Sequence, residues 1–379
     1  MEKQDLLYKV ALTMIPDVGA ITAKKLIAYT GAPEAVFREK PAHLEKIPGI
    51  GKHLSGRITP GHILERAEEE IRRMEKHRIG VLYYQDPDYP WRLKNCEDGP
   101  VLLFHYGEPD FNRSRILSIV GTRSATSYGK SVCENIIAGL ASRHPDLIIL
   151  SGLAYGIDIT AHRAALDYGL CTVGVLAHGL TTIYPLSHGG TARKMVRQGA
   201  LVTDFHSDKQ PERNNFLRRN RIIAGMADAT LVVESARKGG ALITAGLASS
   251  YNRDVLAVPG RSEDTYSAGC NQLIKQNIAA LTESARDIEY ILNWEQQQEE
   301  KEHTPTIHGP LTEEERTILE TILSEPMIGP DVLSVRTAIP MHKLLALLVQ
   351  MELQDWIMIF PGNQYKARVI PEMTQKKSS

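Results

Sequence analysis

The chain lacks the cysteine patterns of a metal-binding or disulfide-bonded protein. Its 379 residues include only four cysteines, and no two of them form a CxxC pair. They are Cys96, Cys133, Cys171 and Cys270. This spacing disfavours a zinc site, and four cysteines do not make a disulfide framework in a chain of this length. We therefore predict reduced thiols, a cytoplasmic protein, and no metal or other cofactor.

Long apolar runs and a strong net charge are also missing. No stretch approaches the ~18 uninterrupted apolar residues of a membrane-spanning helix, and the opening segment, MEKQDLLYKV, contains no apolar signal core. The formal net charge is −1, so no overall field attracts a polyanion. Any contact with nucleic acid must come from a local patch of charge. We expect no association with a membrane.

The length and the shifts in composition along the chain predict several domains. We assign a helical domain to 1–78, a connector with short strands to 79–110, a Rossmann-like domain to 111–293, a linker to 294–310 and a winged-helix-like domain to 311–371. The linker is assigned from its content of Gln, Glu, Pro and His.

The central part alternates apolar strands with helix-forming stretches. The apolar runs are 116–120, 147–150, 172–176, 201–203, 230–233 and 255–258. Segments such as 128–142 and 161–168 separate them. Apolar strands joined by helices favour a parallel sheet that is covered on both faces. The predicted fold class is therefore α/β, with an extended Rossmann-like, doubly wound, mostly parallel sheet between two small flanking domains.

The N-terminal part predicts short helices joined by glycine turns. The turns IPDVG at 15–19 and IPGIG at 47–51 resemble the helix-hairpin-helix units of a SAM-like domain. In such units a glycine turn directs backbone N–H groups at a phosphate. Similar hairpins also serve only for packing or dimerisation, and we favour that role here.

The C-terminal part predicts helices followed by a β-hairpin, as in a winged helix. Thr312 and Glu315 form a capping box at the start of its first helix. The hairpin strands are expected at 356–360 and 365–370, around a Pro-Gly turn. Only His342 and Lys343 are basic near the start of the expected recognition helix. A docking or structural role is therefore favoured over the reading of DNA.

The most informative motif is FLRRNR, at 216–221. Between Lys209 and Arg221 the chain carries five basic residues and one acidic residue. Guanidinium groups beside an aromatic ring on a rigid sheet edge suit a polyanion with stackable bases. The alternative is a solvated, charged helix face. The residues in question are Phe216, Arg218, Arg219 and Arg221.

Small and basic residues follow three of the expected strands. They are Gly121, Thr122 and Arg123 after the first strand, Ser151 and Gly152 after the second, and Lys238, Gly239 and Gly240 after the strand at 230–233. Glycine lets a ligand approach the backbone, and helix N-termini favour anions. Because the carboxyl ends of parallel strands share one edge of a sheet, we predict a single basic groove that binds phosphate.

The sequence nearly matches one nucleotide-binding motif and lacks another. The segment SATSYGKS at 124–131 has Ser124 where a phosphate-binding P-loop needs glycine, and no GxGxxG follows the first strand. An NTPase and a dinucleotide-binding enzyme are therefore disfavoured.

Asp158 and His162 are spaced like an acid and base on one helix face. We favour a structural role, in which hydrogen bonds hold the loop at 151–158. Three further histidines, His178, His188 and His206, show no metal-ligand spacing.

Read together, the motifs of the central part resemble one known family. They are SIVGTR at 118–123, SGLAYGID with Ala161 and His162 at 151–162, GLTTIYP at 179–185, FLRRNRIIAG at 216–225, VVE and KGGALITA at 232–245, and RDVLAVPG and SAGCNQLIK at 253–275. In this order they are similar to the DprA/Smf family, the DNA-processing proteins of bacterial natural transformation. The two flanking domains fit the layout of that family as well.

The resemblance implies a protein that binds single-stranded DNA in a basic pocket of the Rossmann-like domain. It also implies a homodimer formed through that domain, protection of incoming DNA, and loading of a RecA-type recombinase. Neither catalytic turnover nor a cofactor is implied.

The resemblance further assigns roles at matching positions. Arg123 would hold a backbone phosphate, and Phe216 would stack a base. Thr122 and Gly152 would offer loop N–H groups. The remaining pocket residues would be Gly121, Ser151, Arg218, Arg219, Arg221, Lys238, Gly239 and Gly240, with Arg219 or Arg221 alternatively pinning the loop.

The sequence departs from the family pattern at several positions. Leu217 replaces a proline, His178 replaces an asparagine, and Gly239 and Ala241 replace two serines. None of these changes removes a charge. Two other functions are considered, a nucleotide (ribosyl phosphate) hydrolase that uses Glu234 and an adaptor that binds no DNA.

Overall fold

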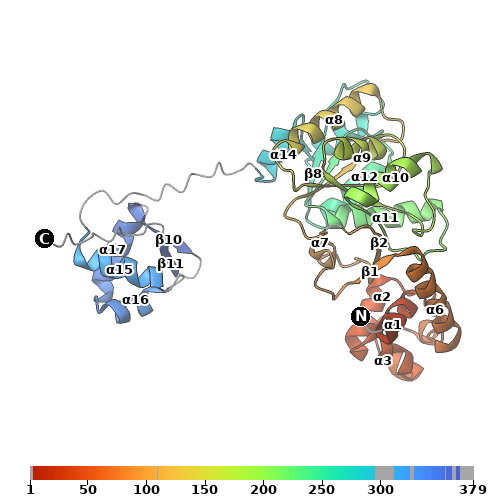
Figure 1. The fold of residues 1–379 in the computed structure, drawn as a ribbon, viewed down its shortest axis with the longest axis horizontal. Coiled ribbons are helices and arrows are strands. Elements are labelled where there is room, and N and C mark those ends of the chain that lie inside the picture. Colours follow the sequence, from red (N-terminus) through yellow and green to blue (C-terminus); the bar gives the residue numbers. More distant parts are fainter. Residues whose placement is uncertain are drawn as a thin grey trace. The chain divides into compact units, whose positions relative to one another are not determined.

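The computed structural model describes residues 3–108, 110–294, 311–324, 328–354, 356–360 and 364–367. The chain forms two compact units, Met1–Trp294 and Glu295–Ser379, and both are drawn in Figure 1. The expected linker at 294–310, apart from the buried Trp294, and the Pro-Gly turn of the expected hairpin lie outside the described residues.

The first unit begins with a helical region. Its helices are α1 (Lys3–Thr13), α2 (Ala20–Thr30), α3 (Pro33–Arg38), α4 (Pro41–Leu44), α5 (Lys52–Ser55) and α6 (Pro60–His77). The two expected glycine turns precede helices, since Gly19 is the N-cap of α2 and Gly51 that of α5. The core of this region continues into the central sheet, because Val10 and Ile71 share one buried cluster with Phe104.

A nine-stranded sheet forms the centre of the first unit. Its order is β1-β2-β6-β5-β4-β3-β7-β8-β9. The strands are β1 (Gly80–Tyr83), β2 (Leu102–Tyr106), β3 (Ile116–Val120), β4 (Ile148–Ser151), β5 (Cys171–Val175), β6 (Ala200–Thr203), β7 (Ala229–Val232), β8 (Asp254–Ala257) and β9 (Ala280–Leu281). Across the sheet, all neighbouring strands between β6 and β9 run parallel to each other. The pairs β1–β2 and β2–β6 are antiparallel. The two strands of the expected connector thus extend the sheet.

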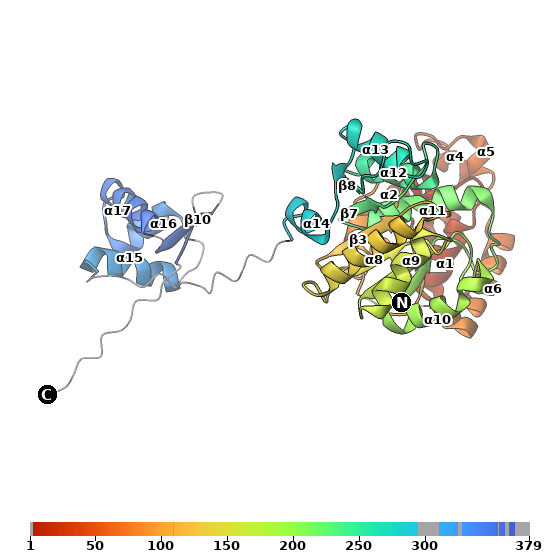
Figure 2. The same ribbon diagram turned by 90° about the horizontal axis from the view of Figure 1, so that it is seen from above.

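Helices cover both faces of this sheet. They are α7 (Trp91–Lys94), α8 (Ser127–Ala141), α9 (Ile157–Asp167), the short 3₁₀ helix Leu186–His188, α10 (Gly189–Gln198), α11 (Arg213–Met226), α12 (Gly240–Ser250), α13 (Ala268–Lys275) and α14 (Ala285–Ile291). In Figure 2, α8 and α9 lie on one side of β3 and β7, and α12 and α13 on the other.

Strand β3 shows why the apolar runs are continuous. Ile116 and Val120 belong to the core under α11 and α12, whereas Leu117 and Ile119 belong to the core under α8 and α9. A strand that is buried on both faces has no solvent side on which polar residues could alternate.

The strand order reverses beside β3. The chain runs from β3 through β4, β5 and β6 toward one edge, and then returns to place β7 on the other side of β3. In open α/β sheets such a switch point leaves a crevice at the carboxyl ends of the strands, where ligands bind. The segments that follow β3 and β7 are therefore brought together.

The second unit has the order of a winged helix. Helices α15 (Glu313–Ser324), α16 (Pro330–Thr337) and α17 (Met341–Leu353) precede the antiparallel strands β10 (Ile357–Phe360) and β11 (Gln364–Ala367). The expected capping box is present, since Thr312 and Glu315 exchange hydrogen bonds of 2.9 and 3.2 Å. Ile318, Leu344 and Trp356 share its core. The predicted fold class, with its mostly parallel α/β sheet and its winged-helix unit, is confirmed.

No single helix among the described residues is long and apolar enough to cross a membrane. Helices α16 and α17 reach that length and apolar character only when they are joined, and the two are bent by 111° at the break between them. Over the same residues, no group of three or more His, Cys, Asp or Glu side chains is placed to hold a metal ion. The four cysteines are buried and free.

Candidate nucleic-acid interface

A groove of about 860 Å³ lies at the switch point of the sheet. Its walls are the loop after β3, helix α11 and the start of α12. Arg123, Arg219 and Lys238, which come from separate crossover segments, all line it, as predicted from their places after the strands and in the FLRRNR motif. Arg213 is a further cation that lines the groove, and Asp158 is the single acidic residue that lines it among the described residues.

Three of the four groove cations are open to solvent. Arg123, Arg213 and Lys238 are exposed, and no ion pair between described residues engages them. Asp158, in contrast, is only 7% exposed and lies against Arg219. The groove therefore presents uncompensated positive charge, although the whole chain is nearly neutral.

The loop after β3 serves the groove through its side chains. The N–H of Thr122 donates to the Glu234 carbonyl at 2.7 Å, so the expected role of this N–H toward a phosphate is wrong. Gly121 is needed for packing, because a Cβ there would collide with Ile157. The guanidinium of Arg123 lies 5.2 Å from the centre of the Phe216 ring.

The start of α8 binds a carboxylate of the protein itself. Thr126 caps α8, and its N–H and hydroxyl donate to the Glu234 carboxylate at 2.9 and 2.5 Å. Gly129 leaves the space that this carboxylate fills. Glu234 is 3% exposed. The carboxylate considered for a hydrolase is thus buried and already engaged as an anchor of α8.

Ser151 and Gly152 lie beneath the groove and do not line it. Ser151 is fully buried, and its hydroxyl donates to the Ile119 carbonyl at 2.5 Å. A Cβ at Gly152 would collide with the guanidinium of Arg219 and the carboxylate of Asp158. The expected place of Ser151 in the pocket and the expected N–H contact of Gly152 are therefore wrong. Gly152 instead makes room for a buried pair of charges.

We expect Gly152→Ala to lower the free energy of unfolding by about 1–3 kcal/mol, because the added methyl group displaces a buried, well-packed pair. Gly246→Ala is the matched control, since a Cβ there meets nothing within 4 Å and α12 gains a better helix former. Urea unfolding of both variants measures the effect. Equal stabilities would contradict this role of Gly152.

Arg219 is a buried support of the groove. It is 5% exposed, and its Nη1 donates to the Val175 carbonyl at 2.7 Å. Burial lowers the pKa of Arg219 to about 10, against the opposing effect of Asp158. Burial raises the pKa of Asp158, and Arg219 opposes that shift. Arg219 stays charged at neutral pH and joins the ends of β4 and β5 to α11.

The FLRRNR motif lies within α11 and not on a sheet edge. Helical periodicity then turns two of its arginines away from the groove. Arg218 is exposed, and its guanidinium lies 5.2 Å from the centre of the Phe205 ring. Arg221 pairs with Asp204 at 2.5 Å and is largely buried. Arg218 therefore does not line the groove as expected, whereas Arg221 takes the alternative role considered for it and pins the loop after β6.

The start of α12 forms the far wall of the groove. Gly239 is its N-cap and Gly240 its first residue. A Cβ at Gly240 would meet nothing within 4 Å, whereas one at Gly239 would collide with Ser235. The first N–H groups of a helix have no partner within the helix, and its dipole favours anions there. Together with Lys238, this end of α12 suits a phosphate.

Several groove residues were missed from the sequence. Along α11 the lining positions follow a helical period, with Arg213, Phe216, Asn220 and Ile223 on one face. A helix assigned to this segment would have revealed Arg213 and Asn220. Tyr184 reaches the groove from a distant loop, and its ring meets that of Phe216 edge-on, with 6.1 Å between centroids. No local signal identifies this contact.

Asp158 and His162 do not form an acid–base pair. His162 is fully buried, and its ring bonds to the Gly152 carbonyl and to Thr172 Oγ1, at 2.5 and 2.7 Å. Asp158 accepts from the N–H of Ala154 at 3.4 Å. Both residues hold the 151–158 loop, and the favoured structural role is confirmed.

Burial lowers the pKa of His162 to about 4, despite the Gly152 carbonyl. Between about pH 6.5 and about pH 4, the unfolded chain binds a proton at His162 and the folded chain does not. The free energy of unfolding therefore decreases as the pH is lowered through this range. We expect His162 to contribute about 3 kcal/mol to that loss. Urea unfolding across this range should show a shallower pH dependence for His162→Gln. Parallel curves for the two proteins would refute the assignment.

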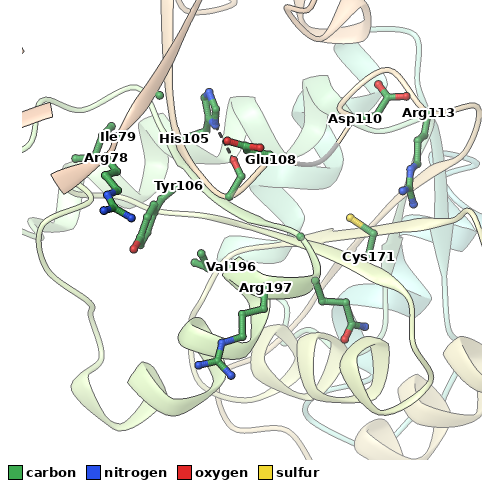
Figure 3. Close-up of a pocket in the computed structure, with 14 residues that line it drawn as sticks. Arg78, Ile79, His105, Tyr106, Glu108, Asp110, Arg113, Cys171, Val196 and Arg197 are labelled. Carbon is green, nitrogen blue, oxygen red and sulfur yellow. Dashed lines mark hydrogen bonds between the residues drawn. The ribbon is translucent and has the colours of Figure 1, made fainter. Parts of the chain in front are cut away.

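A second cleft, of about 650 Å³, lies at the opposite edge of the sheet (Figure 3). Cys171, the first residue of β5, is one of its lining residues. Arg78 lies near Tyr106 at one end, and Asp110 lies near Arg113 at the other (Figure 3). Acidic and basic side chains are mixed here, so this cleft is less suited to a polyanion. It supplies an exposed control arginine, Arg197.

The fold and the groove define a class of protein, a doubly wound α/β protein with a cationic, aromatic-lined groove and an added winged-helix unit. Within that class, the chain belongs to the family of DNA recombination-mediator protein A, whose sequence model matches residues 80–293. A model of the DprA winged helix domain matches residues 302–363. The family predicted from the sequence motifs is confirmed.

Relatives from several bacteria match over much of their length. The DNA processing protein DprA of Streptococcus pneumoniae is 37% identical over 238 residues, which are 62% of this chain and 83% of the relative. Protein Smf of Escherichia coli is 34% identical over 287 residues, with 74% and 75% covered. Protein Smf of Synechocystis is 28% identical and covers 97% of this chain and 100% of the relative.

Solved structures show the same architecture. The X-ray structure of DNA processing protein A from Streptococcus pneumoniae superposes with a TM-score of 0.62 at 29% identity, over 75% of this chain and 97% of that chain. DNA processing protein A from Helicobacter pylori gives a TM-score of 0.52 at 24% identity, over 57% and 96%. The second likeness concerns the fold alone.

Proposed function

We propose that this protein binds single-stranded DNA in the groove at the switch point of its sheet. The observation that carries the proposal is the convergence of three exposed cations, Arg123, Arg213 and Lys238, in one groove that Phe216 also lines. Cations that track a backbone, combined with aromatic platforms, bind single strands with little sequence preference. DNA processing protein A from Helicobacter pylori has a single-stranded DNA binding mode, which supports the same ligand here.

Within the groove, we assign the phosphate contacts to Arg123, Lys238 and the N-terminus of α12. Phe216 and Tyr184 are the stacking platforms. A duplex keeps its bases stacked and paired, and so offers nothing to these rings. We therefore expect single strands to bind more tightly than duplexes of equal length.

Family membership extends the proposal to a role in recombination. We propose that the protein protects incoming DNA during natural transformation and loads a RecA-type recombinase onto it, as a homodimer and without catalytic turnover. Membership of a recombination-mediator family supports this role. A test is whether the full chain accelerates the assembly of a RecA-type recombinase on strands coated with a single-stranded DNA-binding protein. Unchanged assembly would refute the loading role.

The test of the binding itself is a titration of the full chain with fluorescent oligothymidine and with a duplex of equal length. The logarithm of the affinity should fall with the logarithm of the salt concentration, with a slope of about −0.7 for each phosphate contacted. Salt-independent binding, or tighter binding of the duplex, would overturn the proposal.

A nucleotide hydrolase finds no support in the groove. Such an enzyme needs a placed, reactive carboxylate, whereas Glu234 is buried at the start of α8. Incubation with nucleoside monophosphates, followed by detection of free base, tests this alternative. We expect no turnover above background.

A further inference from the structure

Helix α10 exposes a face on which every side chain is basic. Its exposed positions are Gly190, Arg193, Lys194 and Arg197. Residues four apart are neighbours on the surface of a helix, so Arg193 and Arg197 lie one above the other and Lys194 lies beside them. The other side of the helix packs on β5 and β6. We refer to Arg193, Lys194 and Arg197 as the basic face of α10.

The charges of the basic face have no partner in the described part of the chain. Helix α10 contains no Asp or Glu, and no ion pair between described residues engages the basic face. The neighbouring helix α9 exposes Arg163 and Asp167, whose charges balance each other. The basic face therefore attracts an acidic ligand.

The basic face ends at the cleft of Figure 3. Val196 and Arg197, near the end of α10, line this cleft together with Arg78 and Tyr106. Arg78 and Tyr106 are exposed, and Figure 3 shows them on the same side of the cleft as Val196 and Arg197. Aromatic rings and arginines that surround a concave surface are typical of sites that anchor a protein partner. This end of the cleft suits an apolar side chain that is followed or preceded by carboxylates.

Arg78 has a backbone conformation that usually belongs to glycine. It is the C-cap of α6, with φ 54° and ψ 41°. A side chain in this region costs free energy, and such residues are frequent at functional sites. No ion pair or side-chain hydrogen bond among the described residues involves the Arg78 guanidinium. The described fold thus makes no use of this charge, which is free for a ligand.

The cleft also contains negative charge, and this identifies the class of ligand. Glu108 and Asp110 line it, and Figure 3 places Asp110 beside Arg113, at the end away from Arg78. Asp110 accepts a hydrogen bond of 2.8 Å from the N–H of Asn112 and keeps its charge for another partner. A nucleic acid is anionic along its whole length and would be repelled here, whereas a polypeptide can carry acidic and basic side chains in succession.

We propose that the basic face of α10 and this cleft form a docking site for an acidic segment of a partner protein. The carboxylates of the segment lie along the basic face, an apolar side chain enters the cleft beside Tyr106 and Val196, and a basic side chain follows toward Asp110. No described residue lines both this cleft and the groove at the switch point. The docking site is therefore separate from the proposed site for DNA and does not depend on it.

The probe is a short fluorescent peptide with a block of glutamates, then one phenylalanine, then a block of lysines. The comparison peptide has the same composition, with glutamates and lysines in alternation. The full chain should bind the block peptide roughly 3- to 30-fold more tightly, because only that order places each charge opposite its partner. Replacing all three residues of the basic face by alanine should weaken the block peptide roughly 3- to 100-fold, as expected for three exposed ion pairs.

A second variant tests the acidic end of the cleft. The double change Glu108→Gln and Asp110→Asn should bind the block peptide no better than a version in which glutamines replace the lysines. The unaltered chain should prefer the version with lysines. The asparagine at 110 keeps an oxygen for the N–H of Asn112, so the local turn is retained. If both proteins show the same preference, the cleft does not bind the basic side chain as proposed.

The matched control removes three exposed basic residues from α6, where glutamates are interspersed, by the changes Arg66→Ala, Arg72→Ala and Lys76→Ala. This control should keep its affinity for the block peptide. Equal losses in the control and in the α10 variant, or equal binding of the block and alternating peptides, would reduce the site to unspecific attraction and overturn the proposal.

Oligothymidine distinguishes this docking site from the groove. The variant without the basic face should bind oligothymidine as the unaltered chain does. If that variant loses oligothymidine and keeps the block peptide, the basic face binds nucleic acid and the docking proposal is wrong. If the unaltered chain binds oligothymidine with the expected salt dependence but binds neither peptide, the docking proposal is wrong and the proposed function stands.

Discussion

Replacing Arg219 by alanine is expected to lower the free energy of unfolding of the first unit by about 3–5 kcal/mol, because removing one of two neighbouring buried charges leaves the other uncompensated. The change leaves Asp158, which is 7% exposed, without its main compensating charge. It also removes the hydrogen bond to the Val175 carbonyl. Urea unfolding, followed by the tryptophan and tyrosine fluorescence of the full chain, measures the loss.

Two comparisons separate this effect from a general sensitivity of α11. Arg218→Ala, one residue away and exposed, should change stability by less than about 0.5 kcal/mol. Adding Asp158→Asn to Arg219→Ala should restore part of the loss, because the second change removes the uncompensated charge. If Arg218→Ala and Arg219→Ala are equally stable, Arg219 is not the buried support described here.

The apolar runs of the sequence were sufficient to predict the parallel part of the sheet. β3 was predicted without error at 116–120, and β4, β5 and β7 were displaced by one residue. These strands are buried on both faces, so their sequences carry a strong and continuous signal. The short strands β1 and β2 were also detected, but their place in the same sheet was not, because pairing between distant segments leaves no local pattern.

The groove was predicted where the argument rested on topology and not where it rested on residue type alone. Arg123 and Lys238 were predicted to lie at the same edge of the sheet because both follow parallel strands, whose carboxyl ends meet at one edge. In the sequence, however, an arginine that faces solvent cannot be distinguished from one that pairs with a carboxylate inside the protein. Only the fold shows that Arg221 is held by Asp204 and Arg219 by burial beside Asp158.

The charge balance around the groove follows from these pairings. Three carboxylates near the switch point are all engaged inside the protein, Asp158 beside Arg219, Asp204 with Arg221, and Glu234 at the start of α8. Of these three, Asp204 and Glu234 are thus already engaged away from the exposed cations of the groove. A local positive field in a neutral protein limits unspecific attraction to other polyanions and keeps binding at one site.

The double change Arg123→Ala and Lys238→Ala should weaken the binding of oligothymidine by roughly 10²- to 10⁴-fold, because each hydrogen bond to a charged group contributes about 1.5–3 kcal/mol. The slope of affinity against salt should become shallower by about 1.4, which is about 0.7 for each of the two phosphates that the variant no longer holds. Both side chains are exposed, so the stability of the fold should stay the same. Fluorescence anisotropy over a series of salt concentrations measures both quantities.

The matched control is Arg197→Ala, an exposed arginine of the cleft at the opposite edge of the sheet. It removes a positive charge without touching the groove, so any loss caused only by the reduced net charge appears in this variant as well. An equal loss of affinity in the control and in the double variant would show that binding follows overall charge. A loss confined to the double variant, with the shallower salt slope, requires that the strand lies across the carboxyl ends of β3 and β7, where the crossover segments meet.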